Sequence, residues 1–126
     1  MKLFSVDEAN ALLPTVQRIV ARIARAHERV ASSSASAKSV AEDAHASGGG
    51  FMPEGASYVR ALTSVVEGAT EIEALGVQLK DYERGLIDFP TMRDGRVVLL
   101  CWQLGEGDEI EWWHDLETGY AGRQPL

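Results

Sequence analysis

Hydrophobic residues recur at helical spacing in two stretches of the chain and at strand spacing in a third. Apolar positions three and four residues apart place one stripe on a helix that we expect over residues 6–30. The same spacing from Tyr58 to Leu75, followed by Gly76 as a helix-terminating residue, predicts a second helix over residues 56–75. The chain therefore begins with two amphipathic helices.

The first helix has a start signal and one interruption. Ser5-Val6-Asp7-Glu8 matches a capping box, in which the first and last residues satisfy each other's backbone amides, so the helix begins there. Pro14 lies inside the apolar pattern, where it offers no N–H to the carbonyl of Asn10. We therefore expect a kink or a short break at Pro14, with Leu13 as the boundary.

Residues 31–55, between the two helices, are rich in Ser, Ala and Gly. Their apolar side chains are too few and too small to bury much surface, which predicts a flexible connector. Its Ala-rich first half suits a solvated extension of the helix, but the run Ser47-Gly48-Gly49-Gly50 must end any helix. Two helices joined in this way are expected to pack as an antiparallel hairpin.

After the second helix the pattern changes to that of strands. Asp94-Gly95 is a strong signal for a tight hairpin. Val97–Trp102 is apolar on both alternating faces, which predicts a central strand covered on both sides, and Glu109–His114 returns as a third strand. The predicted order is helix 6–30, connector 31–55, helix 56–75, β-meander 77–116 and tail 117–126. This is one α+β domain, 1–126, with a long antiparallel helical hairpin followed by a small antiparallel β-meander.

The turns propose a register for this sheet. A two-residue loop at Asp94-Gly95 places Asp88 directly opposite Cys101. If the second turn is equally tight, at Gly107-Asp108, His114 lies opposite Cys101. A four-residue second turn places His114 opposite Leu99 instead. The shift is by an even number, so a carboxylate, a thiol and an imidazole share one face of three strands in either case.

Three interpretations of these three residues on one face of the sheet stay open. Asp88, Cys101 and His114 are all zinc ligand types, and Glu106 or a water would complete the shell of a divalent metal. The same three residues could form a cysteine nucleophile with a histidine base and an orienting aspartate. The structural alternative, which we favour, is a small buried Cys101, an Asp88 that caps the following turn and a His114 with an ordinary hydrogen bond.

The other face of the sheet is apolar. It collects Ile87, Phe89, Leu100, Trp102, Leu104 and Trp113. Two helices cover only one face, so we expect a partner chain or a ligand on the other, and homodimerisation through the sheet or the helices is our preferred account. The alternative is that the C-terminal tail and the connector fold over that face.

Length and charge narrow the classes of function. The 126 residues carry a formal net charge of −7, but residues 1–41 hold six basic and three acidic groups and residues 42–126 hold six and sixteen. A whole-molecule nucleic-acid binder needs a dominant basic surface, so we do not expect a nucleic-acid partner. The first helix does carry one basic stripe, which we expect to be a solvated face: Arg18, Arg22, Arg25 and Arg29.

Acidic groups and the cysteine complete the inventory. Carboxylates crowd the last predicted hairpin, at Glu106, Asp108, Glu109, Glu111, Asp115 and Glu117. These carboxylates could attract calcium or magnesium. We favour the interpretation that their charge protects the edge of the hairpin and keeps it soluble. Cys101 is the only cysteine, and neither a signal peptide nor an apolar run of about 20 residues occurs, so we expect a cytoplasmic protein without a membrane span.

Several unusual strings in this chain together resemble one family. They are Phe4–Asn10 with Leu12-Leu13-Pro14, Gly85–Pro90, Leu100-Cys101-Trp102, Gly105-Glu106, Trp113–Leu116 and Gly119–Pro125. This set is similar to the bacterial and archaeal domain of unknown function 2203, over nearly the whole chain except residues 31–55. The resemblance implies a small stand-alone cytoplasmic prokaryotic protein with no assigned activity.

Three functional hypotheses follow. The leading one is a non-enzymatic, homodimeric binding or regulatory module, since no complete catalytic constellation is visible. Its candidate ligand-binding residues are Trp102, Trp113 and Arg123, the last of which could meet an anionic ligand or pair with the acidic hairpin. The second is a metal-binding protein or metal-dependent enzyme that holds zinc through Asp88, Cys101, Glu106 and His114. The third is a nucleic-acid accessory protein that uses the basic stripe of the first helix.

Overall fold

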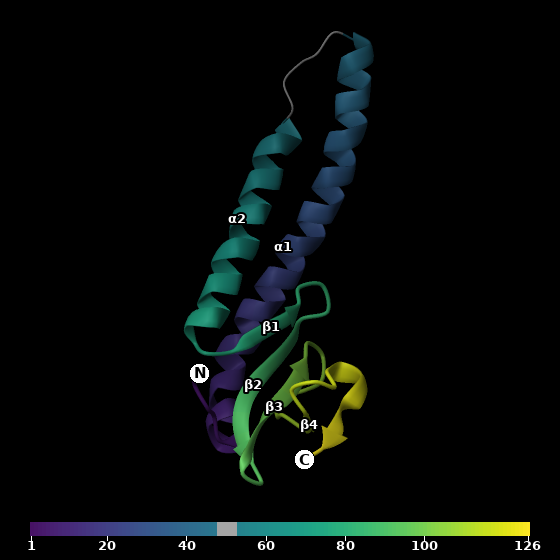
Figure 1. Ribbon diagram of the computed structural model, residues 1–126. Helices are drawn as coiled ribbons and strands as arrows, with labels where there is room; N and C mark the ends of the chain where they lie inside the picture. The colour runs from purple at the N-terminus through teal and green to yellow at the C-terminus, as the bar shows by residue number, and fades with distance from the viewer. Residues whose placement is uncertain (48–52) are drawn as a thin grey trace.

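The computed structural model describes the backbone of residues 1–47 and 53–126 and the side chains of residues 1–32 and 55–126. Within these residues, two antiparallel helices precede an antiparallel sheet (Figure 1). The helices are α1 (Val6–Ser47) and α2 (Pro53–Ala74). The strands, in sheet order, are β1 (Gln78–Asp81), β2 (Leu86–Arg93), β3 (Arg96–Gln103), β4 (Trp112–His114) and β5 (Gln124–Pro125). The predicted α+β fold, a helical hairpin followed by a β-meander, is confirmed.

α1 begins at the predicted capping box. The amide of Glu8 donates to Ser5 Oγ and the amide of Ser5 donates to Glu8 Oε1, both at 3.0 Å. The helix then runs unbroken through Pro14, so the boundary expected at Leu13 is wrong. Leu13 is fully buried in the core whereas Pro14 is exposed, and the proline therefore costs one backbone bond on the solvent side without displacing the packed face.

α1 also continues past residue 30, through residues 31–47 of the predicted connector, as far as Ser47. The Ala-rich composition of that segment favours a helix. Residues 48–52 hold the glycine run and lie outside the described residues. The prediction of a flexible connector therefore stays a prediction for this segment.

The two helices pack closely at Gly68. A Cβ at this position would lie 2.4 Å from Ile23 Cγ1, so a larger residue would force the Ile23 side chain to move. Arg22 and Glu71 bridge the same pair of helices at 2.5 Å. α2 ends before Gly76, whose φ of +83° is the left-handed conformation expected of a residue just after a helix.

The hairpin between β2 and β3 has the predicted register. Asp94 and Gly95 have φ values of +51° and +79°. A two-residue hairpin turn of type I′ requires positive φ at both of its central residues. Arg93 pairs with the residue after the turn, and Asp88 consequently lies opposite Cys101.

The connection from β3 to β4 is longer than a tight turn. β4 begins at Trp112 rather than at the predicted Glu109, and His114 pairs with Leu99. This is the second of the two registers considered above.

Contacts of the connection explain the shorter strand. Ile110 turns into the core, where it is 4% exposed, and its amide donates to Asn10 Oδ1 on α1 at 2.8 Å. The indole N–H of Trp102 donates to the carbonyl of Gly107 at 2.9 Å. The loop is therefore held by the helix and the core instead of extending the sheet.

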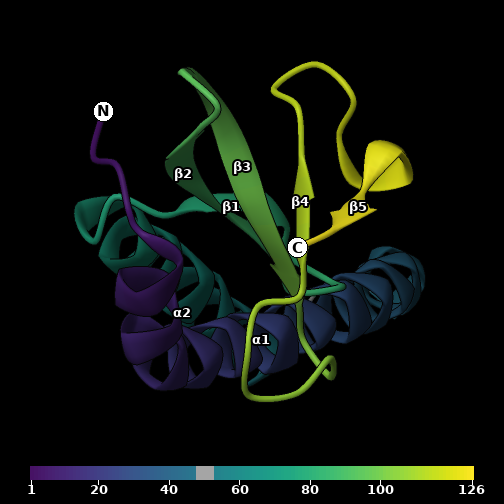
Figure 2. The same ribbon diagram turned by 90° about the horizontal axis from the view of Figure 1, so that it is seen from below.

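The segment after β4, predicted as a tail, adds structure of its own. A 3-10 turn at Tyr120–Gly122 precedes β5, which pairs with β4. Figure 2 shows this C-terminal segment beside β4, at the opposite end of the sheet from α2.

The centre of the sheet is buried on both faces. On the inner face, aromatic and aliphatic residues of the strands form one core with α1: Ile87, Phe89, Leu100, Trp102 and Trp113 pack with Leu13, Val16, Val20 and Ile23. On the face away from the helices, called the outer face here, Asp88, Leu99, Cys101 and His114 are 0–2% exposed. Arg123 of the C-terminal segment contributes to this cover, since it donates to the carbonyl of Cys101 at 3.5 Å. The C-terminal segment therefore covers part of the outer face, which was the alternative considered from sequence, while Met92 on the same face is 53% exposed.

Candidate functional site

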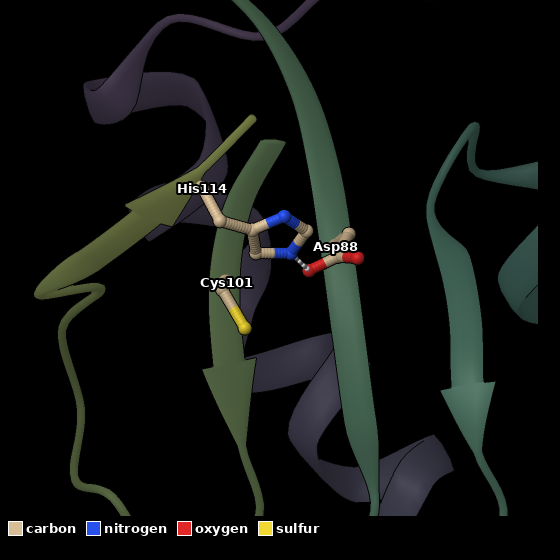
Figure 3. Close-up of side chains that lie close together, drawn as sticks. All are labelled: Asp88, Cys101 and His114. Carbon is tan, nitrogen blue, oxygen red and sulfur yellow. Dashed lines mark hydrogen bonds and ion pairs between the residues drawn. The ribbon is translucent and has the colours of Figure 1, made fainter. Parts of the chain in front are cut away.

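The outer face brings together three side chains from three adjacent strands. Asp88 lies on β2, Cys101 on β3 and His114 on β4, and each offers one metal-ligating atom (Figure 3). These three atoms all lie within 4.8 Å of one another. Because the pleat alternates side chains, the even register shift at His114 keeps it on the same face as the other two residues. We call these three residues the Asp–Cys–His cluster.

Both ring nitrogens of His114 have partners. Nδ1 lies 2.8 Å from the carbonyl oxygen of Asp115, and Nε2 lies 3.0 Å from Oδ1 of Asp88. A carbonyl oxygen only accepts, so the network assigns a proton to Nδ1. One further proton then lies between Nε2 and the Asp88 carboxylate, and the buried pair is neutral as a whole wherever that proton sits.

The thiol of Cys101 is poorly suited to be a nucleophile. Burial raises its pKa, the nearby carboxylate of Asp88 raises it further, and Arg123 opposes the rise, with the result that the pKa is about 12. The nucleophile hypothesis also requires a histidine nitrogen to accept the thiol proton. In His114 one nitrogen is committed to a backbone carbonyl and the other to Asp88, so the geometry does not support a cysteine–histidine–aspartate triad.

Glu106 lies apart from the cluster, in a second site with Arg123. The guanidinium donates from two nitrogens to the two carboxylate oxygens at 2.7 and 2.8 Å, and the amide of Gln103 donates to Oε1 at 2.6 Å. Burial acts to raise the pKa of Glu106, but these hydrogen bonds outweigh it and hold the pKa below its ordinary value. Glu106 is therefore not placed to ligate a metal together with Asp88, Cys101 and His114.

Arg123 is held by aromatic rings as well. Its guanidinium carbon lies 5.0 Å from the ring centre of Trp112 and 4.7 Å from that of Tyr120, and Arg84 stacks on Tyr120 at 4.6 Å. Of the two roles considered from sequence, pairing with the acidic hairpin is the one present here. Sequence reasoning missed Trp112, Tyr120 and Arg84, because no local pattern links residues that only the folded C-terminal segment brings together.

The other candidate ligand residues are in the core. Trp102 is 1% exposed and Trp113 is 7% exposed, and both pack in the cluster between the sheet and α1. Arg93 stacks on Trp113 at 4.7 Å. Their size and burial identify a packing role for both indoles in this fold.

The basic stripe of α1 and the acidic segment around Glu106–Glu117 are both partly neutralised by ion pairs. On the basic stripe, Arg22 is paired with Glu71 of α2, while Arg25 and Arg29 are exposed. In the acidic segment, Asp115 pairs with Arg96 and Glu106 with Arg123. Among the side chains that the structure describes, the acidic residues of this segment form no group of three ligands.

Comparison with known proteins places the chain in a family. Residues 2–126 match the family model described as "Uncharacterized conserved protein (DUF2203)". The chain therefore belongs to this family, as the sequence resemblance indicated. No curated protein matches the chain, and no solved structure matches it either. Within the described residues, no helix combines the length and the apolar character needed to cross a membrane.

Proposed function

We propose that this protein is a non-enzymatic binding module that works as a homodimer, with α2 at the dimer interface. The observation that carries the proposal is a row of large apolar side chains on the surface of α2. Val59 is 59% exposed, Leu62 is 42% exposed and Val66 is 58% exposed. A patch of this kind on a helix surface is typical of a site that meets another protein.

The spacing of these residues distinguishes them from the packed side of α2. Ala61, Gly68 and Ile72 face α1 and are buried. Val59, Leu62 and Val66 follow one another at intervals of three and four residues, and half-buried Ala69 continues the series. A 3-4-3 series forms a seam for a second helix, as in coiled coils and four-helix bundles. We call these four residues the α2 seam.

A second copy of the chain is the occupant that this surface suits. The seam continues into a hollow lined by Ala69, Glu73, Val77, Leu79 and Tyr82, where β1 is the edge strand of the sheet. Tyr82 is 41% exposed at its end. Two hairpins that pair through α2 about a twofold axis would complete a four-helix arrangement, and a self-complementary apolar seam is what such an axis requires.

The polar flank of α2 provides the control for a test. Arg60 and Glu67 lie on the helix side turned away from the seam and are exposed. A glutamate introduced at Val66 would bury an unpaired charge in the interface, whereas a glutamate at Arg60 makes the helix more negative outside the interface.

The experiment is a measurement of molar mass in solution over the micromolar range. Wild type and Arg60→Glu are expected to have the mass of two 13.7 kDa chains, and Val66→Glu the mass of one, with unchanged circular dichroism. The dissociation constant of Val66→Glu should rise at least about tenfold. A monomeric wild type, or a Val66→Glu variant that dimerises as well as wild type, would show that the proposal is wrong.

A further inference from the structure

We infer that Asp88, Cys101 and His114 form a buried site for one divalent transition-metal ion of the zinc class. The inference rests on the outer face of the sheet and is independent of the dimer proposed above. Each of the three strands at the centre of the sheet supplies one donor, and the strands are held in register by backbone pairing. Figure 3 shows the His114 ring directed toward the Asp88 carboxylate, with the Cys101 thiol beside this pair.

The donor set selects the metal. A cysteine sulfur and a histidine nitrogen are ligands that zinc and its neighbours prefer, whereas calcium and magnesium take oxygen ligands. Tetrahedral zinc with bonds of about 2.0–2.3 Å places its ligand atoms about 3.3–3.6 Å apart. The three donors here lie within 4.8 Å of one another, so small side-chain rotations bring them to that spacing. A water molecule would take the fourth position.

His114 is already oriented for metal binding. Its Nδ1–H donates to the carbonyl of Asp115 at 2.8 Å, which leaves Nε2 as the nitrogen that faces Asp88. A backbone carbonyl on the far nitrogen is the usual support of a metal-bound histidine, because it selects the tautomer and locks the ring. Binding of the metal would release two protons to solvent, the one between Nε2 and Asp88 and the thiol proton of Cys101.

Charge balance favours a divalent ion in so buried a place. The cluster residues are 0–2% exposed, and burial of a net charge is costly. One carboxylate and one thiolate offset the two positive charges of the ion, and the neutral imidazole adds none. A site with Asp88, Cys101 and a divalent ion is therefore neutral overall, which no other ion charge achieves with these ligands.

The test is direct metal loading of the full-length protein. Protein freed of metal by a chelator is given Co²⁺ or Zn²⁺, passed through a desalting column and analysed for metal by mass spectrometry. We expect one ion per chain and, with Co²⁺, a thiolate-to-metal charge-transfer band in the near ultraviolet. Absence of retained metal would overturn the inference, and would leave the cluster as a hydrogen-bonded pair beside a thiol.

Two variants and a matched control assign the site. Cys101→Ser keeps the side-chain volume and removes the sulfur, so the charge-transfer band should disappear and affinity should fall at least about a hundredfold. His114→Gln should lose binding to a similar extent. Thr91→Val is the control, because Thr91 is also buried on β2, at 6% exposure, but faces the core beside Val98. Equal metal retention by all four proteins would contradict the assignment.

X-ray absorption of the zinc-loaded wild type needs no variant to fold. We expect one sulfur ligand at about 2.3 Å and nitrogen or oxygen ligands at about 2.0–2.2 Å. A shell of nitrogen and oxygen alone would show that any bound metal lies elsewhere, since Cys101 is the only cysteine in the chain.

Discussion

Two carboxylates near Cys101 are satisfied in different ways. Glu106 is bound by Arg123, whose guanidinium does not give up its proton, so this contact is a lasting ion pair. Asp88 is bound by His114, whose imidazole exchanges a proton readily. The first contact fastens the C-terminal segment to the loop after β3. The second holds a proton that a metal ion could displace, which is why we place the candidate metal site at Asp88 and not at Glu106.

The Glu106–Arg123 pair predicts a pH-dependent contribution to stability. The Glu106→Gln variant leaves a guanidinium that is 9% exposed without its counter-charge, and should lower the free energy of unfolding by about 1–3 kcal/mol at pH 7. Because the pKa of Glu106 is lowered on folding, the wild-type advantage is fully present above the ordinary value of 4.5 and is lost as pH falls through the folded pKa.

Urea unfolding of wild type and variant at pH 7 and at successively lower pH measures this difference. Glu109→Gln is the control, because Glu109 is an exposed carboxylate in the same loop, and it should change stability by less than about 0.5 kcal/mol. A constant gap between wild type and Glu106→Gln at all pH values would contradict the assignment of the pH dependence to Glu106.

At the scale of elements, α2 has two different sides. One side is fitted to α1 so closely that Gly68 leaves no room for a Cβ beside Ile23. The other carries the exposed seam of Val59, Leu62 and Val66. A single stripe of apolar residues was expected from the sequence, because their spacing fits one broad face. The folded hairpin divides that face into a buried half and an exposed half, and the exposed half is the basis of the proposed dimer.

The tight contact at Gly68 gives a prediction for this element. Gly68→Ala raises intrinsic helix propensity, yet its Cβ would lie 2.4 Å from a fully buried Ile23, so the variant should be less stable by about 1–3 kcal/mol. Gly55→Ala, in the same helix, meets nothing within 4 Å, and should be more stable by about 0.5–1 kcal/mol. Thermal unfolding of both variants tests the contrast, and a stabilised Gly68→Ala would show that the helices can separate without cost.

At the scale of the whole molecule, contacts between distant parts of the chain tie the helices and the termini to the sheet. The amide of Phe4 donates to the carbonyl of Pro90 at 2.8 Å, and the amide of Leu126 donates to the carbonyl of Glu111 at 2.9 Å. Asn10 on α1 accepts from the amide of Ile110 at 2.8 Å. The helical and sheet parts are thereby joined by specific hydrogen bonds as well as by the shared core.

The Asn10 contact can be tested by itself. Asn10→Ala leaves the amide of Ile110 unpaired in a part-buried place, and should lower the free energy of unfolding by about 1–2 kcal/mol. Gln17→Ala removes another half-buried amide side chain from α1 and should cost less than about 0.5 kcal/mol. Denaturant unfolding of the two variants measures this difference in the free energy of unfolding. If both variants lose the same amount of stability, the hydrogen bond between Asn10 and Ile110 has no special role.

The sequence alone determined those features that depend on neighbouring residues. Ser5 and Glu8 satisfy each other's amides, and Asp94-Gly95 adopts the φ values of a tight turn, because both signals act within four positions. That turn was sufficient to place Asp88 opposite Cys101. The period of the apolar residues likewise determined the order of helices and strands.

Only the tertiary structure decided the rest. The register of His114 depends on a loop whose Ile110 is drawn into the core and bound by α1, a contact that spans 100 positions. The cover over the outer face and the pairing of Glu106 with Arg123 depend on the C-terminal segment returning beside β4. Local propensity has no information on such contacts, since their energy is released only when distant segments have already met. For that reason the chemistry of the Asp–Cys–His cluster follows from the fold, although its three residues could be named beforehand.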